Sequence, residues 1–135
     1  MIFHLAFPVN NLSETRAFYT EILGCELGRS ADKWIDINFF GHQLSAHLSE
    51  DCKNVIRNNV EDKSIPVPHF GCILSYEDFE VLEDRLRTKN INFEFEPFIR
   101  FPGEKGEQKT MFLQDPSGNF LEFKAFRENK QLFET

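Results

Sequence analysis

The sequence contains little cysteine, few polar aromatic residues and no excess of positive charge. Its 135 residues include three cysteines, Cys25, Cys52 and Cys72. This odd number without a C-x-x-C pair argues against a disulfide framework. The 15 Lys and Arg residues are outnumbered by 22 Asp and Glu residues, which gives a net charge of −7. A nucleic-acid-binding protein usually carries a basic footprint, and an anionic membrane surface would repel this chain.

Long hydrophobic runs are also missing. No apolar run approaches the roughly 18 residues that a membrane span requires. Met1 leads directly into Ile2 and Phe3, with no basic segment before an apolar one and no usual cleavage site. We therefore expect a soluble, cytoplasmic protein whose residues 1–135 form a single domain.

Phenylalanine is the residue that the chain has in abundance. There are 16 Phe, against two Tyr and one Trp. Each buried ring removes a large apolar area from water, so a core built from Phe is the simpler interpretation. The alternative is that several of these rings line an apolar cavity.

The first half of the chain reads as one strand, one helix and three strands. Residues 2–9 form a short apolar run of strand length. Asn11 and Glu14 have the spacing of a capping box, and Gly24 is a suitable end for the helix that follows. Further strands are expected at about 25–30, 33–40 and 43–49. Residues 50–66 are polar and aperiodic, which is typical of a linker.

The same order of elements then returns. Residues 67–74 are again an apolar strand, Ser75 and Asp78 begin a helix, and Asn90 ends it. Strands are expected at about 92–99, 109–115 and 119–126. Residues 127–135 form a mostly polar tail.

This order is an internal repeat with a period of about 65 residues. Module one covers about residues 1–49 and module two about residues 67–126. Each module is too small to hide its own apolar face. The sequence therefore predicts an α+β fold in which two βαβββ modules form a curved mixed sheet with the helices on its outer face.

The repeat gives two histidines equivalent positions. His4 and His69 each lie near the start of the first strand of their module. Because side chains alternate along a strand, the bulkier neighbours face the helix and each histidine faces the other way. Both imidazoles are therefore expected on the concave side of the sheet.

Two residues of the final strands extend this set. Glu122 is a charge inside the apolar strand 120–126, where burial is costly unless the carboxylate is paired or bound to a metal. His47 lies six residues after Gly41, and Glu122 lies four residues after Gly118. Both offsets are even, so both side chains project to the same kind of face. His42 faces the opposite way and is a poor candidate.

Two imidazoles and a carboxylate are the ligands of an open-sided divalent metal site. His4, His69 and Glu122 form such a set, and His47 would make it a set of three histidines and one glutamate. Iron, manganese, zinc or nickel would accept these ligands, and the sequence does not distinguish among them. The alternative is that all four are ordinary polar side chains with satisfied hydrogen bonds.

Arg100 and Lys109 flank the glycine-rich loop 101–107. They are candidates to bind an anionic group of a substrate, and solvated surface charge is the alternative.

The chain resembles the vicinal-oxygen-chelate superfamily. This superfamily includes glyoxalases, fosfomycin-resistance transferases, bleomycin-resistance proteins and extradiol dioxygenases. The resemblance covers residues 2–126. Its matching stretches are HLAFPVNNL at 4–12, AFYTEILG at 17–24, PHFG at 68–71 and FLQDPSGNFLE at 112–122.

The resemblance implies that His4, His69 and Glu122 are the metal ligands and that His47 occupies the variable fourth position. It implies a metal-dependent enzyme in which a small oxygen-rich substrate chelates a divalent metal and undergoes a lyase- or isomerase-like reaction. Glu122, as a ligand carboxylate that can be displaced, is the candidate catalytic base.

Two alternatives remain. Ring-cleaving dioxygenases of this superfamily usually place a tyrosine acid shortly before the ligand glutamate, where this chain has Phe112, a residue that we expect in the substrate pocket. A bleomycin-resistance protein would hold a small drug-like molecule without turnover, although such members have generally lost the metal ligands.

Assembly is expected to involve a second copy of the chain. In this superfamily two modules pair within one chain or between chains, and the site lies where they meet. A second copy would also cover the exposed sheet edges. We therefore predict a homodimer with two equivalent metal sites.

Overall fold

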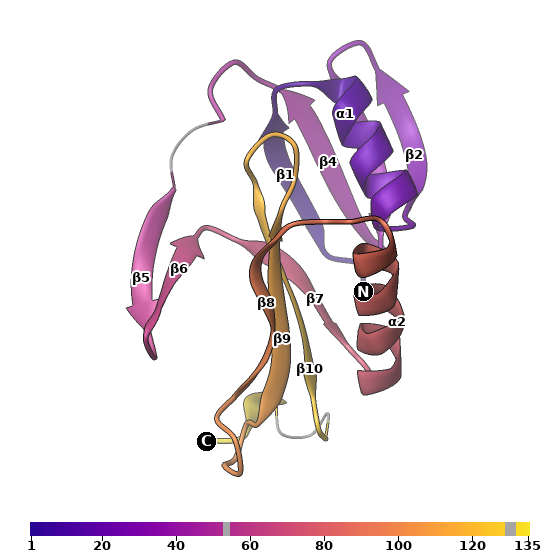
Figure 1. Ribbon diagram of the computed structural model, residues 1–135. Coiled ribbons are helices and arrows are strands. Elements are labelled where there is room, and N and C mark those ends of the chain that lie inside the picture. The colour runs from indigo at the N-terminus through magenta and orange to yellow at the C-terminus, as the bar shows by residue number, and fades with distance from the viewer. Residues whose placement is uncertain (53–54, 129–131) are drawn as a thin grey trace. The chain divides into compact units, whose positions relative to one another are not determined.

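The computed structural model describes residues 1–52, 55–128 and 132–135. It confirms the predicted α+β fold with two βαβββ modules (Figure 1). The chain divides into two compact units. The first unit contains Met1–Ile56 and Asp115–Asn119, and the second contains Arg57–Gln114 and Phe120–Thr135.

The first unit has a four-stranded mixed sheet in the order β1-β4-β3-β2. Strand β1 runs parallel to β4, and the other pairs are antiparallel. Its elements are β1 (His4–Val9), α1 (Leu12–Ala17), η1 (Phe18–Ile22), β2 (Glu26–Ala31), β3 (Trp34–Phe39) and β4 (His42–Leu48).

The helix of this unit begins as the sequence predicts. The Asn11 side chain accepts a hydrogen bond from the Glu14 backbone N–H at 2.9 Å. After Ala17 the α-helix continues as the single π-helical turn η1, so the expected helix has two parts. The helix and one face of the sheet bury an apolar core made of Phe7, Val9, Phe18, Tyr19, Leu23, Ile35, Ile37, Phe39, Leu44 and Ala46.

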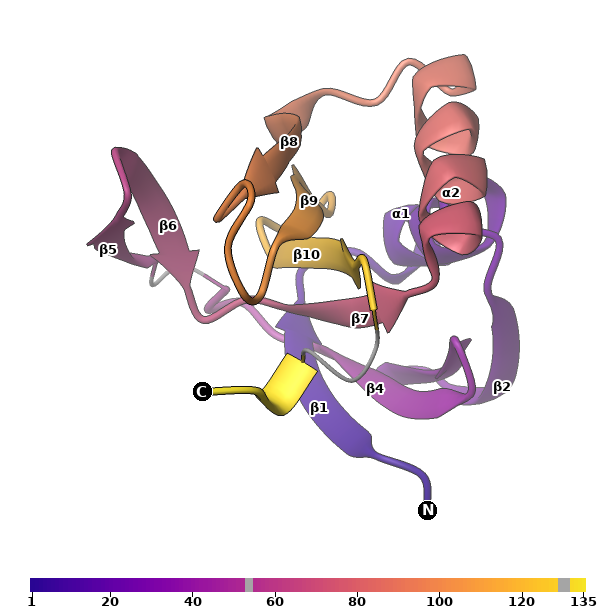
Figure 2. The ribbon, with the colours of Figure 1, turned by 90° about the horizontal axis from the view of Figure 1, so that it is seen from below.

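The second unit repeats this design with the sheet order β7-β10-β9-β8 (Figure 2). The Ser75 hydroxyl caps its helix by accepting a hydrogen bond from the Asp78 N–H at 3.0 Å. Its elements are β7 (Phe70–Leu74), α2 (Tyr76–Thr88), β8 (Phe93–Arg100), β9 (Gln108–Gln114) and β10 (Phe120–Phe126). The helix-facing core comprises Phe79, Leu82, Leu86, Met111, Leu113, Leu121, Phe123 and Ala125.

The segment 50–66, whose composition predicts a linker, contains most of a hairpin that the composition does not indicate. In this hairpin β5 (Ile56–Val60) pairs with β6 (Lys63–Val67) as a two-stranded sheet. The Lys63 ammonium lies over the rings of Phe95 and Phe98, and the Arg57 guanidinium lies over the ring of Phe120. These contacts with residues distant in sequence stabilise the hairpin, and a local pattern cannot show them.

Other expected boundaries shift by a few residues. The strand predicted at 67–74 begins only at Phe70, so His69 lies directly before β7. Residues 53–54 of the expected linker and 129–131 of the expected tail lie outside the described residues. In the described ranges, no helix has the length and apolar character needed to cross a bilayer.

The turn Asp115–Asn119 between β9 and β10 belongs to the first unit. The Asn119 side chain donates a hydrogen bond to the Pro8 carbonyl at 2.8 Å. The Ser117 hydroxyl accepts one from the Asn10 N–H at 3.0 Å. Hydrogen bonds therefore hold the turn against the end of β1.

Candidate metal centre

His69 and Glu122 are in direct contact in the second unit. Nε2 of His69 lies 3.0 Å from Oε2 of Glu122. The other ring nitrogen, Nδ1, lies 2.7 Å from the Pro66 carbonyl oxygen. Because a carbonyl can only accept, Nδ1 carries a proton and donates it. Nε2 then either donates a second proton to Glu122 or offers its lone pair to a metal ion.

Glu122 is a buried carboxylate with several donors around it. The residue is 5% exposed. Its Oε1 accepts a hydrogen bond from the Thr110 hydroxyl at 2.8 Å. Lys124 Nζ lies 3.7 Å from Oε2, and Arg100 Nη1 lies 3.9 Å from Oε1. Positive charge therefore compensates a carboxylate that would otherwise be costly to bury.

These contacts shift the acidities of the pair in opposite directions. Burial by itself raises the pKa of Glu122, but the hydrogen bond from His69, the Lys124 charge and the Thr110 hydroxyl together lower it. The hydrogen bond to Glu122 raises the pKa of His69 and outweighs the opposing effect of burial. Without a metal the two side chains thus favour an ion pair.

The same pair fits a divalent metal. His69 Nε2 and Glu122 Oε2 lie 3.0 Å apart, which is the distance of a charge-assisted hydrogen bond. An imidazole nitrogen and a carboxylate oxygen are also donor types that divalent metals accept. Metal-bound histidines usually donate their other N–H to a carbonyl or carboxylate, as His69 does to Pro66. The donor types, and the hydrogen bond that orients His69, are therefore compatible with two metal ligands.

Phe112 lies beside this pair. It is opposite Glu122 in the β9–β10 register and is fully buried. Its ring meets the His69 ring edge to face, with the centroids 5.2 Å apart. It supplies an apolar wall and, unlike a tyrosine, has no proton to donate.

Arg100 and Lys109 lie in different surroundings. Arg100 is near Glu122, as described above. The Lys109 ammonium instead pairs with Glu83 of α2 at 3.1 Å and lies over the Phe79 ring. Side chains alternate along β9, so Lys109 faces α2 whereas Thr110 faces Glu122. The structure does not bring Lys109 together with the other candidates, and we leave it out of the site.

His4 and His47 belong to the first unit. His4 is opposite Gln43 and His47 is opposite Pro8 in the β1–β4 register, so both histidines lie on the face of the sheet away from α1. Both residues are exposed. His42 has another role, since its Nδ1 accepts a hydrogen bond from the Phe3 N–H at 3.0 Å.

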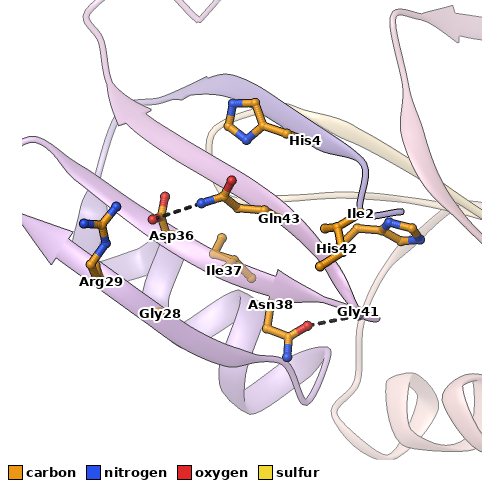
Figure 3. Close-up of a pocket in the computed structure, with 10 residues that line it drawn as sticks. All are labelled: Ile2, His4, Gly28, Arg29, Asp36, Ile37, Asn38, Gly41, His42 and Gln43. Atoms are coloured by element: carbon orange, nitrogen blue, oxygen red, sulfur yellow. Dashed lines mark hydrogen bonds between the residues drawn. The ribbon is translucent and has the colours of Figure 1, made fainter.

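A pocket of about 620 Å³ opens on this face of the first unit (Figure 3). His4 of β1, Gln43 of β4 and Asp36 of β3 follow one another across it. The pocket also takes in Gly28 and Arg29 of β2. No spacing of residues in the sequence predicts this pocket.

The described residues do not assemble a complete ligand set. Among residues 1–52, 55–128 and 132–135, no group of three or more His, Cys, Asp or Glu side chains is arranged to hold a metal ion. His4 and His47 lie in the first unit, and His69 and Glu122 lie in the second. Each unit by itself offers two of the four predicted ligands.

Three partners of the His69–Glu122 pair escaped the sequence analysis. Lys124 could have been predicted from the sequence, because a residue two positions after Glu122 lies on the same face of the strand. Thr110 depends on the β9–β10 register, and the Pro66 carbonyl depends on the path of the chain before β7. Neither of these leaves a signal in residue spacing.

Several solved structures are similar to this chain. A crystal structure of a glyoxalase/bleomycin resistance protein/dioxygenase from Alicyclobacillus acidocaldarius is 34% identical, with a TM-score of 0.82, over 98% of this chain and 96% of that one. The genomically encoded fosfomycin resistance protein FosX from Listeria monocytogenes shares the fold at 17% identity, with a TM-score of 0.73 over 98% of both chains. A second FosX structure, complexed with Mn(II) and sulfate, is 17% identical, with a TM-score of 0.70 over 98% of this chain and 94% of that one.

The family model for the Glyoxalase/Bleomycin resistance protein/Dioxygenase superfamily matches residues 1–123. This range includes the first module, the second module as far as the middle of β10, and all four predicted ligand positions. By its sequence and its fold, the chain belongs to the glyoxalase/bleomycin resistance protein/dioxygenase superfamily.

Proposed function

We propose that this chain is a metal-dependent enzyme of the glyoxalase type that acts on a small, oxygen-rich substrate in a lyase- or isomerase-like reaction. The observation that carries the proposal is the His69–Glu122 pair, with Nε2 and Oε2 3.0 Å apart and Nδ1 held by the Pro66 carbonyl.

His4, His69 and Glu122 would hold the metal, with His47 as the fourth ligand. The Mn(II) named in one FosX structure is consistent with such a site in the superfamily. Iron, manganese, zinc and nickel all accept nitrogen and oxygen ligands of these types. When bound, the divalent ion supplies a Lewis acid that stabilises negative charge on substrate oxygens.

Glu122 also has the properties of a catalytic base. The surrounding donors lower its pKa and keep the carboxylate ionised, which leaves its oxygens able to accept a proton although it makes the group a weaker base. The Arg100 guanidinium is 13% exposed at its side chain and lies beside Glu122, where it would bind an anionic substituent. Phe112 would exclude water from this side of the site.

Phe112 also bears on the dioxygenase alternative. A tyrosine in its place would provide an acid beside the metal, whereas the buried phenyl ring provides none. The lyase- or isomerase-like reaction therefore has more support, since it needs only the metal and a base.

The proposed site draws ligands from both modules, which is consistent with a homodimer in which one chain completes the site of the other. We propose this dimer, with two equivalent sites, in the cytoplasm. A small-molecule substrate is the only partner that the site chemistry requires.

Metal analysis tests the proposal. Protein purified without added metal should retain about one divalent ion per chain. The variants His69→Ala and Glu122→Ala should lose most of it, because each removes a ligand. His42→Ala is the matched control, since this imidazole bonds to the Phe3 N–H and should not affect the metal content.

Absence of metal from the wild-type protein, or equal metal content in all three variants, would contradict the proposal. Unchanged small-molecule binding in the two ligand variants would then favour a binding protein of the bleomycin-resistance type. A screen of substrates against the reconstituted metals would identify the reaction.

A further inference from the structure

Asp36 is a buried carboxylate at the base of the pocket in the first unit. The residue is 8% exposed, and it lies in the centre of the sheet on β3. Its neighbours on the same face are Gln43 and Ser45 of β4 and Gly28 of β2. No role for this carboxylate follows from the metal centre described above.

Neutral groups fix the Asp36 carboxylate in place. Oδ1 accepts a hydrogen bond from the Ser45 hydroxyl at 2.6 Å. Oδ2 accepts one from the Gln43 amide at 3.2 Å, which Figure 3 shows. A carboxylate offers about four acceptor positions. Two donors therefore orient the group and leave acceptor capacity directed at the pocket.

The negative charge of Asp36 has no positive partner among the described residues of this unit, which are 1–52, 55–56 and 115–119. Among the residues that the structure describes, no Lys, Arg or His nitrogen lies within ion-pair distance of this carboxylate. Arg29 lines the same pocket but is exposed and does not reach it. A buried, uncompensated charge is costly, and a cation from outside would relieve that cost.

Glycine keeps the approach to Asp36 open. A Cβ atom on Gly28 would lie 3.3 Å from the Asp36 Cβ. A side chain at position 28 would therefore crowd Asp36 at the wall of the pocket that both residues line. With glycine there, a pocket of about 620 Å³ has room for a small organic group.

We propose that this pocket binds a positively charged nitrogen group, an ammonium or amidinium, through hydrogen bonds to the Asp36 carboxylate. Such groups bring both the N–H donors and the charge that Asp36 lacks. Because His4 lines the same pocket, the cation would be a substituent of the enzyme's substrate. Only this last assignment rests on the proposed function.

The test uses benzamidine as a cationic probe and benzamide as its neutral counterpart, each titrated into isotope-labelled full-length protein without added metal. Benzamidine should shift the amide resonances of Gly28, Asn38 and Gln43 saturably. Benzamide should bind roughly tenfold more weakly or worse, since a charge-assisted hydrogen bond is stronger than a neutral one.

Two variants connect the binding to the carboxylate. Asp36→Asn removes the charge at nearly constant shape and should weaken benzamidine binding roughly tenfold or more. Gly28→Val keeps the charge but fills the space and should abolish binding, which preserves the test if Asp36→Asn does not fold. Arg29→Gln is the control, and it should bind benzamidine at least as well as the wild type.

Three results would overturn the proposal. They are equal binding of the two probes, full benzamidine binding by Asp36→Asn or Gly28→Val, and loss of benzamidine binding in Arg29→Gln. His69→Ala distinguishes the two proposals of this protein. It should lose metal yet bind benzamidine like the wild type, so a failure of the metal site leaves the Asp36 result unaffected.

Discussion

The Tyr19 hydroxyl donates a hydrogen bond to the Asp115 carboxylate at 3.0 Å, although 96 positions separate the two residues. Both are buried, with Tyr19 fully inaccessible and Asp115 4% exposed. The same carboxylate accepts hydrogen bonds from the Ser117 N–H and from the backbone and side chain of Asn119. One aspartate therefore shapes the turn before β10 and binds it to the helix of the first module.

This arrangement predicts a graded loss of stability. Tyr19→Phe should lower the free energy of unfolding by about 1 kcal/mol, because Asp115 keeps its other donors. Asp115→Ala leaves the phenol and the turn donors without an acceptor and should cost about 2–4 kcal/mol. Urea denaturation measures both, with the exposed Asp32→Ala as control at about 0.5 kcal/mol or less. Equal losses in the two test variants would contradict a central role for Asp115.

The same contact predicts an alkaline limit of stability. Burial, with the nearby Asp115 charge and hydrogen bond, raises the pKa of Tyr19 well above the ordinary 10.0. The folded state therefore keeps a proton that the unfolded chain loses near pH 10. Above that pH the folded state binds more protons than the unfolded state, so stability falls as the pH rises.

A variant with Tyr76→Phe leaves Tyr19 as the sole tyrosine for this measurement. Its tyrosinate absorbance should stay flat through pH 10 and rise only together with the loss of tertiary structure. Adding Tyr19→Phe should remove this part of the alkaline destabilisation. Ionisation of Tyr19 near pH 10 in a fully folded protein would refute the assignment.

Gly71 is predicted to be essential for the pairing of β7 with β10. A Cβ atom at this position would overlap the backbone carbonyl oxygen of Glu122, its partner in the register. Gly71→Ala must therefore push the strands apart and displace Glu122 from His69. We expect a loss of more than about 3 kcal/mol in unfolding free energy, together with loss of bound metal.

Gly103→Ala is a suitable control for this substitution. Its Cβ would meet nothing within 4 Å, although the backbone φ of +75° is strained for alanine. Only a conformational cost of about 1 kcal/mol is expected, with the metal content unchanged. Denaturation and metal analysis of the two variants measure both effects, and similar losses in the two would contradict the role of Gly71.

The proposed dimer predicts complementation between inactive variants. If each site takes His4 from one chain and Glu122 from the other, co-expressing His4→Ala with Glu122→Ala should restore one metal site per heterodimer. Co-expressing His69→Ala with Glu122→Ala should restore none, because both changes lie in the second module. A monomer in sedimentation at micromolar concentration would count against the dimer, and failure of the first mixture would count against a shared site.

The sequence by itself determined the repeat and most of its elements. Asn11 and Ser75 cap the two helices where their spacing predicts, and the alternation of apolar residues identifies the helix-facing side of each sheet. These features depend on neighbours a few positions apart, where a turn of helix or the pleat of a strand fixes geometry. The charge of Glu122 within an apolar strand was likewise visible, because an isolated carboxylate there calls for a partner.

The alternation of side chains along β9 also predicts that Lys109 lies away from the other candidates. Lys109 and Phe112 are separated by an odd number of positions on one strand, so they cannot share a face. Lys109 was a candidate because it flanks the glycine-rich loop. In the structure it forms an ion pair with Glu83 instead. Strand period, more than proximity to a loop, decides which residues meet in a site.

Only the tertiary structure decided the remaining relationships. The β5–β6 hairpin depends on Arg57 and Lys63 lying over distant aromatic rings, and the Asp36 pocket depends on four strands lying side by side. The contact of His69 with Glu122 joins residues more than 50 positions apart. Such contacts form only when strand order and register are set, and those follow from burying whole apolar faces, not from any local pattern of residues.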